Sequence, residues 1–139
     1  MKYIYERTIN YYETDKMGVV HHSNYLRFLE EARCQFLLEN NLPYTTFEES
    51  NIMIPVLAAN LVYKTPVTFA DIISIEVELI HYTGVQFAAR YTVTNKNTGS
   101  LVITGETKHC FISNNFKPVN IRKTVPEIHE QFNKLLSTN

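Results

Sequence analysis

The chain has 139 residues, of which 45% are hydrophobic and 19% are charged, and its formal net charge is -1. It has the length and composition of one folded domain, residues 1–139, and lacks the basic excess typical of nucleic-acid-binding proteins. Its longest apolar run, residues 52–59, is far shorter than the ~18 residues of a membrane span. Because the N-terminal residues contain no apolar signal core, we expect a cytoplasmic protein without a membrane span.

The first predicted elements are a strand and a long helix. Residues 3–11 alternate in polarity, which indicates a half-buried strand. After a connecting loop at residues 15–22, a helix is expected to begin at Ser23 or Asn24 and to end near Asn40. The apolar stripe of this helix consists of Tyr25, Phe28, Leu29, Ala32, Phe36 and Leu37.

The rest of the chain predicts an antiparallel sheet and a second helix. Further strands are expected at residues 53–64, 71–82, 85–93 and 101–113. A closing helix is predicted to begin at Thr124, because Thr124 and Glu127 form a capping-box pattern. One long helix beside a sheet of about five strands is an α+β layer, in which the sheet can wrap around the helix.

Several reactive or charged side chains have ordinary structural interpretations. Cys34 and Cys110 show no disulfide spacing, so both are expected to be buried free thiols. Glu30 and Arg33 lie three residues apart outside the apolar stripe, so a surface ion pair is the default expectation. No metal is expected, because the usual zinc spacing is absent from the candidate ligands, which are His21, His22, His81, His109 and Cys110.

The loop ahead of the long helix carries the side chains best suited to chemistry. Asp15 precedes a glycine turn at Gly18, and the helix begins a few residues later. A helix N-terminus supplies backbone N–H donors for a carbonyl oxygen, and a nearby carboxylate supplies a base or a nucleophile. The arrangement therefore indicates acyl transfer, although Asp15 could equally form an Asx turn ahead of Gly18.

This order of elements, together with the Asp15 motif, resembles the hot-dog fold. More narrowly, it resembles the 4-hydroxybenzoyl-CoA thioesterase family, and within it the YbgC-like acyl-CoA thioesterase branch. Thr8 and His21 depart from the residues that the family often has at these positions, and both changes could alter the acyl pocket. The matching residues are Tyr11, Thr14, Asp15, Gly18, Val19, Val20, His22, Asn24, Tyr25, Glu30, Ala32, Arg33, Tyr63, Lys64, Pro66 and Asp71.

The resemblance implies a hot-dog domain, with an antiparallel sheet of about five strands wrapped around one long central helix and a short C-terminal helix. It implies a thioester hydrolase that acts on acyl-CoA, with an acyl carrier protein thioester as the alternative substrate, and without a cofactor or metal. It also implies a homodimer or homotetramer with active sites at the subunit interface. The family's catalytic residues fall on Asp15, Tyr11 and His22.

Each of these three residues has a defined role and a structural alternative. Asp15 would either attack the thioester carbonyl, giving an anhydride, or activate a water molecule. A backbone N–H near His22 would polarise the carbonyl oxygen, while the His22 side chain could instead cap the helix or face solvent. Tyr11 could orient Asp15, water or substrate, but it also lies on the core face of the predicted strand and could simply be packed there.

Three other functions compete with hydrolysis, the third of which is a purely structural interaction domain. A hot-dog hydratase or dehydratase usually relies on a histidine paired with an acid on the helix or in the following loop, whereas here the acid precedes the helix. A non-catalytic acyl-thioester-binding module has no need of a carboxylate beside an anionic ligand. For the phosphates of coenzyme A the sequence offers Lys64, Arg90, Lys108, Arg122 and Lys123 without distinguishing among them.

Overall fold

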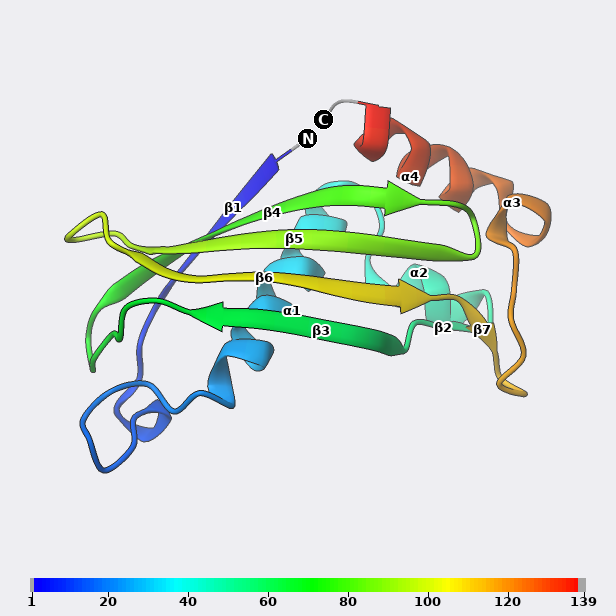
Figure 1. Cartoon of the computed structure of the whole chain (residues 1–139). Helices are drawn as coiled ribbons and strands as arrows, with labels where there is room; N and C mark the ends of the chain where they lie inside the picture. Colours follow the sequence, from blue (N-terminus) through cyan, green and yellow to red (C-terminus); the bar gives the residue numbers. More distant parts are fainter. Residues whose placement is uncertain (1, 138–139) are drawn as a thin grey trace.

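A computed structural model describes residues 2–137 (Figure 1); residues 1, 138 and 139 of the expected domain lie outside the described residues. In chain order the elements are β1 (Lys2–Thr8), the short 3-10 helix η1 (Tyr11–Glu13), α1 (Asn24–Glu39), α2 (Tyr44–Glu49), β2 (Ile52–Met53), β3 (Val56–Tyr63), β4 (Ile72–Tyr82), β5 (Gln86–Asn95), β6 (Leu101–Cys110), β7 (Ile112–Ser113), α3 (Ile121–Thr124) and α4 (Pro126–Ser137). No helix in this range is long and apolar enough to cross a membrane.

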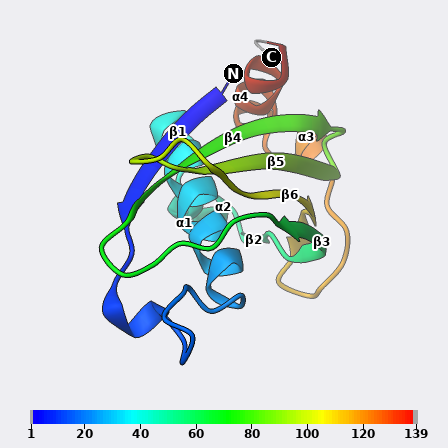
Figure 2. The ribbon, with the colours of Figure 1, turned by 60° about the vertical axis from the view of Figure 1, so that its left-hand side comes forward.

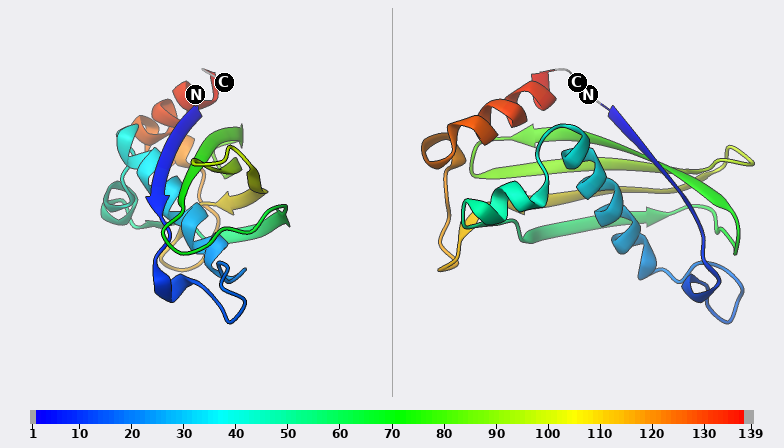
Figure 3. Two further views of the ribbon diagram at one scale, coloured as in Figure 1. Left: turned by 90° about the vertical axis from the view of Figure 1, so that its left-hand side faces the viewer. Right: turned by 180° about the vertical axis from the view of Figure 1, so that it is seen from behind.

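Five strands form one antiparallel sheet in the order β1-β4-β5-β6-β3, and β2 pairs separately with β7. The sheet curves around α1, which lies along its concave face (Figures 2 and 3). The α+β layer expected from the sequence is therefore confirmed, including its five-stranded sheet. Strand β3 lies at one edge of this sheet and β1 lies at the other.

Helix α1 forms the core side of the layer because its apolar residues repeat at helical spacing. All six residues of the expected stripe are buried, with Leu29 and Ala32 completely inaccessible to solvent. Burial of each large aliphatic or aromatic side chain contributes roughly 1.5–3 kcal/mol. The long central helix therefore owes its position to the stripe that the sequence shows.

Strand β4 shows the matching alternation on the sheet. Its inward residues Ile73, Ile75 and Val77 are fully buried, while the intervening Glu76 and Glu78 are only partly covered. Because successive side chains point to opposite faces of a strand, this pattern places one apolar face against α1. The half-buried strand predicted for residues 71–82 is confirmed.

An aromatic cluster closes the end of the sheet away from the N-terminus of α1. Rings from α2, β4, β5 and α4 meet here, and Tyr82 stacks on Phe132 with ring centroids 4.9 Å apart. The Tyr82 hydroxyl lies 2.7 Å from Nδ1 of His129 on α4. The cluster comprises Phe47, Tyr82, Phe87, Phe111 and Phe132. Helix α2, which the sequence did not indicate, is thus held by tertiary packing of Phe47.

The first strand ends earlier than expected, at Thr8. The Glu13 carboxylate accepts a hydrogen bond from the Asn10 backbone N–H at 2.8 Å, and this bond turns the chain into η1. Tyr11 therefore lies in η1 and is 74% exposed. The expectation that Tyr11 lies on the core face of a strand is wrong.

The beginning of the closing helix also differs from the expectation. Thr124 is the last residue of α3, and its hydroxyl donates to the Asn120 carbonyl at 3.3 Å. The Asn120 side chain caps α3 by accepting from the Arg122 N–H at 3.1 Å. Helix α4 then begins at Pro126, a residue favoured at the first helical position.

Two smaller expectations need correction. Arg33 is 6% exposed and donates from Nη1 to the Tyr91 hydroxyl at 3.0 Å, so it does not form the expected surface pair with Glu30. This bond reaches across the core from α1 to β5, which spacing along the chain cannot reveal. Cys34 and Cys110 are free thiols as expected, although both are half-buried and not fully buried.

Candidate active site

The loop that carries Asp15 is anchored by an ion pair at its base. Arg7, on β1, donates two hydrogen bonds to the Glu13 carboxylate at 2.8 and 3.0 Å. The Arg7 guanidinium carbon also lies 3.9 Å from the centre of the Phe28 ring on α1. Since Glu13 is 7% exposed, this paired charge joins the strand, the loop and the helix in a water-poor environment.

The loop itself is closed by backbone hydrogen bonds. The Asp15 N–H donates to the Val19 carbonyl at 2.8 Å, and the Gly18 N–H donates to the Asp15 carbonyl at 2.9 Å. Gly18 has a φ of +81°, a conformation that a glycine adopts without steric cost. The glycine turn expected after Asp15 is therefore present.

A second loop lies against this one and completes the site. The Val20 N–H donates to the Val67 carbonyl at 2.9 Å, and Val19 forms a bridge with Thr68. Asp71 stabilises the second loop, because its Oδ2 accepts from the Thr68 N–H at 2.9 Å. The two loops together form one wall of a cavity.

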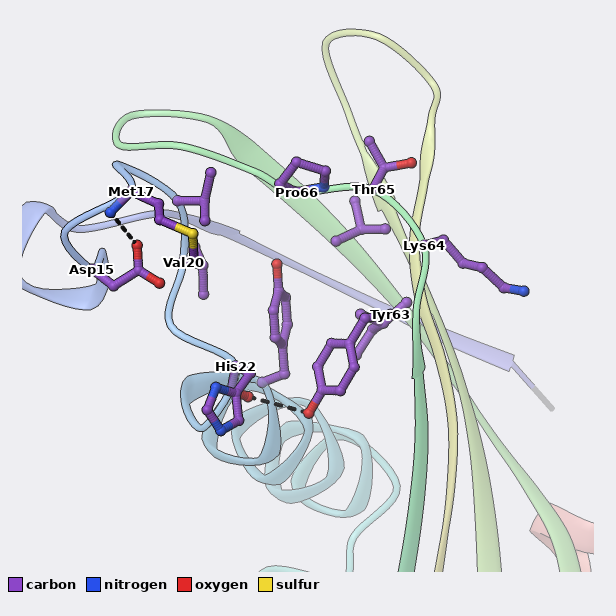
Figure 4. A pocket seen from close by; sticks show the side chains of 12 residues that line it. Asp15, Met17, Val20, His22, Tyr63, Lys64, Thr65 and Pro66 are labelled. Atoms are coloured by element: carbon purple, nitrogen blue, oxygen red, sulfur yellow. Dashed lines mark hydrogen bonds between the residues drawn. The ribbon is translucent and has the colours of Figure 1, made fainter.

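This cavity of about 250 Å³ lies between the Asp15 loop, the beginning of α1 and the end of β3 (Figure 4). It brings together Asp15 and His22, two of the three residues that the sequence singled out. Its lining consists of Asp15, Met17, Val19, Val20, His22, Tyr25, Tyr63, Lys64, Thr65, Pro66, Val102 and Ile103. The Lys64 side chain extends away from Asp15 (Figure 4).

Asp15 has one carboxylate oxygen bound and one free. Its Oδ1 accepts from the Met17 N–H at 2.8 Å, so the Asx turn considered as a structural alternative is present. No residue among 2–137 donates a hydrogen bond to Oδ2. The structural role therefore occupies one oxygen and leaves the second one available in the cavity.

His22 lies at the beginning of α1, two residues ahead of Asn24. Its ring stacks on His21 with centroids 4.4 Å apart, and its carbonyl accepts from the Tyr63 hydroxyl at 3.5 Å. Within the described residues 2–137, the backbone N–H of His22 has no acceptor. A free N–H at a helix N-terminus is the type of donor that stabilises a carbonyl oxygen as negative charge develops on it.

Tyr11 is not among the residues that line the cavity. Its ring packs edge-on against Phe69, with centroids 5.6 Å apart. The structure therefore places Tyr11 on the surface beside the Asp15 loop, and its catalytic role stays a prediction.

Tyr25 lines the cavity, although the sequence indicated only a core residue. It is 4% exposed, and burial, with a smaller contribution from Tyr63, raises its pKa to about 12. The phenol is therefore neutral at physiological pH and can donate a hydrogen bond into the cavity. The available signal was a hydroxyl-bearing residue in an otherwise apolar stripe, in the first turn of the helix.

No group of three or more histidine, cysteine, aspartate or glutamate side chains suited to holding a metal ion occurs within residues 2–137. The cavity offers a carboxylate, a backbone N–H donor and phenol hydroxyls for chemistry. Asp15 supplies the negative charge, His22 supplies the free N–H, and Tyr25 supplies a neutral hydroxyl.

Comparison with known proteins identifies the family. Residues 9–132 match the thioesterase-like superfamily. The chain belongs to this superfamily. It is 30% identical to the acyl-CoA thioesterase YbgC of Helicobacter pylori, and the match covers 86% of this chain and 94% of that protein. It is 31% identical to a 1,4-dihydroxy-2-naphthoyl-CoA hydrolase of Crocosphaera subtropica, covering 78% of this chain and 81% of that protein.

A solved structure supports the same assignment. The crystal structure of DHNA-CoA thioesterase from Staphylococcus aureus superimposes with a TM-score of 0.93 and is 29% identical in sequence, covering 98% of this chain and 91% of that one. The hot-dog fold expected from the sequence is confirmed. The family assignment also confirms the expectation of a thioester hydrolase.

Proposed function

We propose that this member of the thioesterase-like superfamily hydrolyses an acyl-CoA thioester to the free acid and coenzyme A, with Asp15 as the essential carboxylate. The observation that carries the proposal is the free Oδ2 of Asp15 in the same cavity as His22, whose backbone N–H has no acceptor within residues 2–137. An attacking group and an oxyanion donor are the two components that thioester hydrolysis needs at one place.

The cavity lining suggests how the substrate would lie. The thioester carbonyl would place its oxygen near the His22 N–H, at the positive end of α1, and its carbon near Asp15. One such donor lowers an acyl-transfer barrier by about 2.7–4 kcal/mol. The acyl group would then contact the buried Tyr25, Val102 and Ile103, away from water.

Two routes are open to the Asp15 carboxylate. As a nucleophile, its oxygen bonds to the acyl carbon and the carbon–sulfur bond breaks, which gives a mixed anhydride and the thiolate of coenzyme A. Water then cleaves the anhydride. As a general base, Asp15 removes a proton from a water molecule whose oxygen attacks the same carbon, and the thiolate leaves with a proton returned by the solvent or the carboxyl group.

Replacement of Asp15 by asparagine tests the proposal. Asparagine keeps a side-chain oxygen that can accept from the Met17 N–H, so the loop should fold as before. We expect Asp15→Asn to lose at least a hundredfold in kcat for free-thiol release from acyl-CoA, with an unchanged melting temperature, as is typical for removal of a catalytic proton-transfer group. Wild-type activity in this variant would rule out the assignment.

Asp71→Asn is the matched control. Asp71 also accepts a backbone N–H, from Thr68, but it does not line the cavity. We expect this variant to retain most activity even if it is slightly less stable. Binding of acyl-CoA without thiol release by the wild-type protein would instead indicate a non-catalytic acyl-thioester-binding module.

A single turnover in heavy-oxygen water tests for the nucleophilic route. A general base places solvent oxygen in the product acid in the first turnover. A nucleophile whose anhydride is opened at the Asp15 carbonyl releases an acid that carries an oxygen from the protein, and the label then resides on Asp15. Mass spectrometry of the product and of the peptide that contains Asp15 detects the label, and label on Asp15 assigns the nucleophilic route with opening at the Asp15 carbonyl.

We further propose that the protein forms a homodimer through β3. This edge strand has eight residues, and all but one of them are exposed. Its exposed apolar side chains include Val56, Leu57, Val62 and Tyr63, which are 46–54% exposed. A long apolar edge strand is a template for pairing with another strand, and a second copy in antiparallel orientation would extend the sheet. Tyr63 also lines the cavity, so such an interface would border the site.

A further inference from the structure

The space between α1 and the β3 edge of the sheet is organised in three levels. On α1, the residues that face this space follow each other at intervals of four, so they share one side of the helix. On the sheet, directly paired residues of β3 and β6 recur at intervals of two, so they share one face. The levels are Tyr25 with Tyr63 and Ile103, Leu29 with Leu61 and Gly105, and Arg33 with Ala59 and Thr107.

The first and third levels are hollow. The three first-level residues line the cavity that contains Asp15. The three third-level residues line a second cavity of about 260 Å³, whose remaining wall residues are Leu26, Arg27, Glu30 and Val56. The corresponding rungs of β3, at Tyr63 and Ala59, are about 13 Å apart at the usual rise of a strand.

The middle level is closed. A Cβ atom built on Gly105 would lie 3.4 Å from Cγ of Leu61 and 3.5 Å from Cδ1 of Leu29. Leu61 of β3 and Leu29 of α1 therefore both lie within van der Waals distance of the position that a side chain on Gly105 would occupy. Leu29 is completely buried and Leu61 is half-buried, and both lie at the level between the two cavities without lining either of them.

We propose that Leu61, which lies with Leu29 beside Gly105 at this middle level, forms the floor of the acyl pocket and limits the length of the acyl chain. This inference rests on the proposed function, since it requires the acyl group to enter the first cavity. The substrates are then thioesters whose acyl group, either a short aliphatic chain or a single small ring, ends at the middle level. A longer chain would have to displace Leu61 to reach the second cavity.

Leu61 is the residue to vary, because it lies on the exposed edge strand and not on the buried helix. Leu61→Ala should open the floor and connect the two cavities, whereas Leu61→Phe should raise the floor. Leu38→Ala is the matched control, since Leu38 lies on α1 but is 50% exposed and belongs to none of the three levels.

Binding of S-alkyl coenzyme A thioethers of increasing chain length measures the floor without turnover. We expect wild-type affinity to stop rising beyond a short chain. In Leu61→Ala it should continue to rise, by about fourfold for each methylene group that enters the second cavity. The affinity of Leu61→Phe should stop rising at a shorter chain than the affinity of the wild type. Leu38→Ala should bind each thioether with wild-type affinity.

The same variants assayed for thiol release separate this inference from the proposed function. If the wild-type protein hydrolyses acyl-CoA and Leu61→Ala and Leu61→Phe keep its chain-length profile, then Leu61 does not form the floor of the acyl pocket. The proposed function is unaffected by this result. If the chain-length selectivity of binding shifts with Leu61 but the wild type releases no thiol, the role of Leu61 as the floor is supported and the proposed hydrolase activity is overturned. A wild type that neither binds any thioether nor releases thiol overturns both.

Discussion

The two carboxylate oxygens of Asp15 have different roles. Oδ1 holds the turn by accepting from the Met17 N–H, and Oδ2 has no partner among residues 2–137. The Asx-turn interpretation and the catalytic interpretation of the sequence therefore do not exclude each other. The sequence alone could not show this, because a motif names the residue but does not assign its individual atoms.

A substitution of Gly18 tests how far kcat depends on the conformation of the Asp15 loop. Its φ of +81° favours glycine, and an added Cβ would meet no atom within 4 Å. Gly18→Ala should therefore cost only backbone strain, about 1 kcal/mol of unfolding free energy, while kcat falls because Asp15 moves. Chemical denaturation and thiol-release assays measure the two effects.

Gly99→Ala serves as the control for this substitution. Gly99 has a φ of +77° and equally open surroundings, but it lies in the turn between β5 and β6. We expect the same loss of stability with unchanged kcat. Equal losses of kcat in the two variants would show that general destabilisation, and not the shape of the Asp15 loop, reduces the activity.

The phenol of Tyr25 should be neutral at physiological pH and should stay neutral at a higher pH than an ordinary tyrosine. Burial, followed by the nearby Tyr63, raises its pKa from 10 to about 12. Between these two pH values ordinary tyrosines ionise while Tyr25 stays protonated. The tyrosinate absorbance of Tyr25→Phe should therefore follow that of the wild type near pH 10 and fall below it only near pH 12. A deficit already visible near pH 10 would contradict the buried position of this hydroxyl.

At the scale of elements, the Arg7–Glu13 pair links β1 to the site loop. Both side chains are about nine-tenths buried, and Nε of Arg7 also lies 3.3 Å from the more exposed carboxylate of Glu31, so removal of Glu13 leaves Arg7 with one partner instead of two. Glu13→Ala should lower the free energy of unfolding by about 1–3 kcal/mol and reduce kcat as well. The more exposed pair between Lys96 and Glu6 provides the comparison, and Glu6→Ala should cost less than about 1 kcal/mol.

Strand β6 contains an acid-sensitive element. His109 is completely inaccessible, accepts or donates a bond with the Thr107 hydroxyl at 2.8 Å and stacks on Phe87 at 4.6 Å. Burial, and secondarily the positive charge of Arg33, lowers its pKa from 6.5 to about 3. The folded protein therefore keeps this imidazole neutral where the unfolded chain would bind a proton.

Acidification should reduce the contribution of His109 to the stability of the folded protein. Above pH 6.5 the contribution of His109 to stability is complete, and it falls as the pH decreases from 6.5 toward 3, since protons then favour the unfolded chain. The slope is at most about 1.4 kcal/mol per pH unit. Urea unfolding of His109→Gln should show a shallower decline on acidification than the wild type. Parallel declines would contradict a neutral buried His109.

How well each element could be predicted depends on whether its cause is local. Helix α1 and strand β4 followed from periodicity, because one buried face imposes a repeat of 3.6 or 2 residues on the sequence. The end of β1 was missed because the Glu13 side chain turns the chain there. Helix α2 was missed because its six residues are too few for a repeat and are held by Phe47 in the aromatic cluster.

At the scale of the whole molecule, the exposed β3 edge predicts a defined assembly. Sedimentation should show a dimer, and Val62→Lys should yield a folded monomer, because symmetry would place the new charge in the interface twice. Val62 is 46% exposed in the single chain, so the substitution should not disturb the core. Ile4→Lys, on the opposite edge strand, is the control and should leave the dimer intact. A monomeric wild type would remove the proposed interface.

The sequence by itself determined the fold class, the central helix with its buried stripe, and the motif that contains Asp15 and His22. These features are local, since periodicity, turn residues and helix caps act over a few neighbouring positions. Only the tertiary structure decided that Tyr25 borders the cavity, that Tyr11 does not, and that Leu61 and Leu29 both lie beside Gly105. Those relations join distant segments, and the distance along the chain carries no information about which side chains the curved sheet brings together.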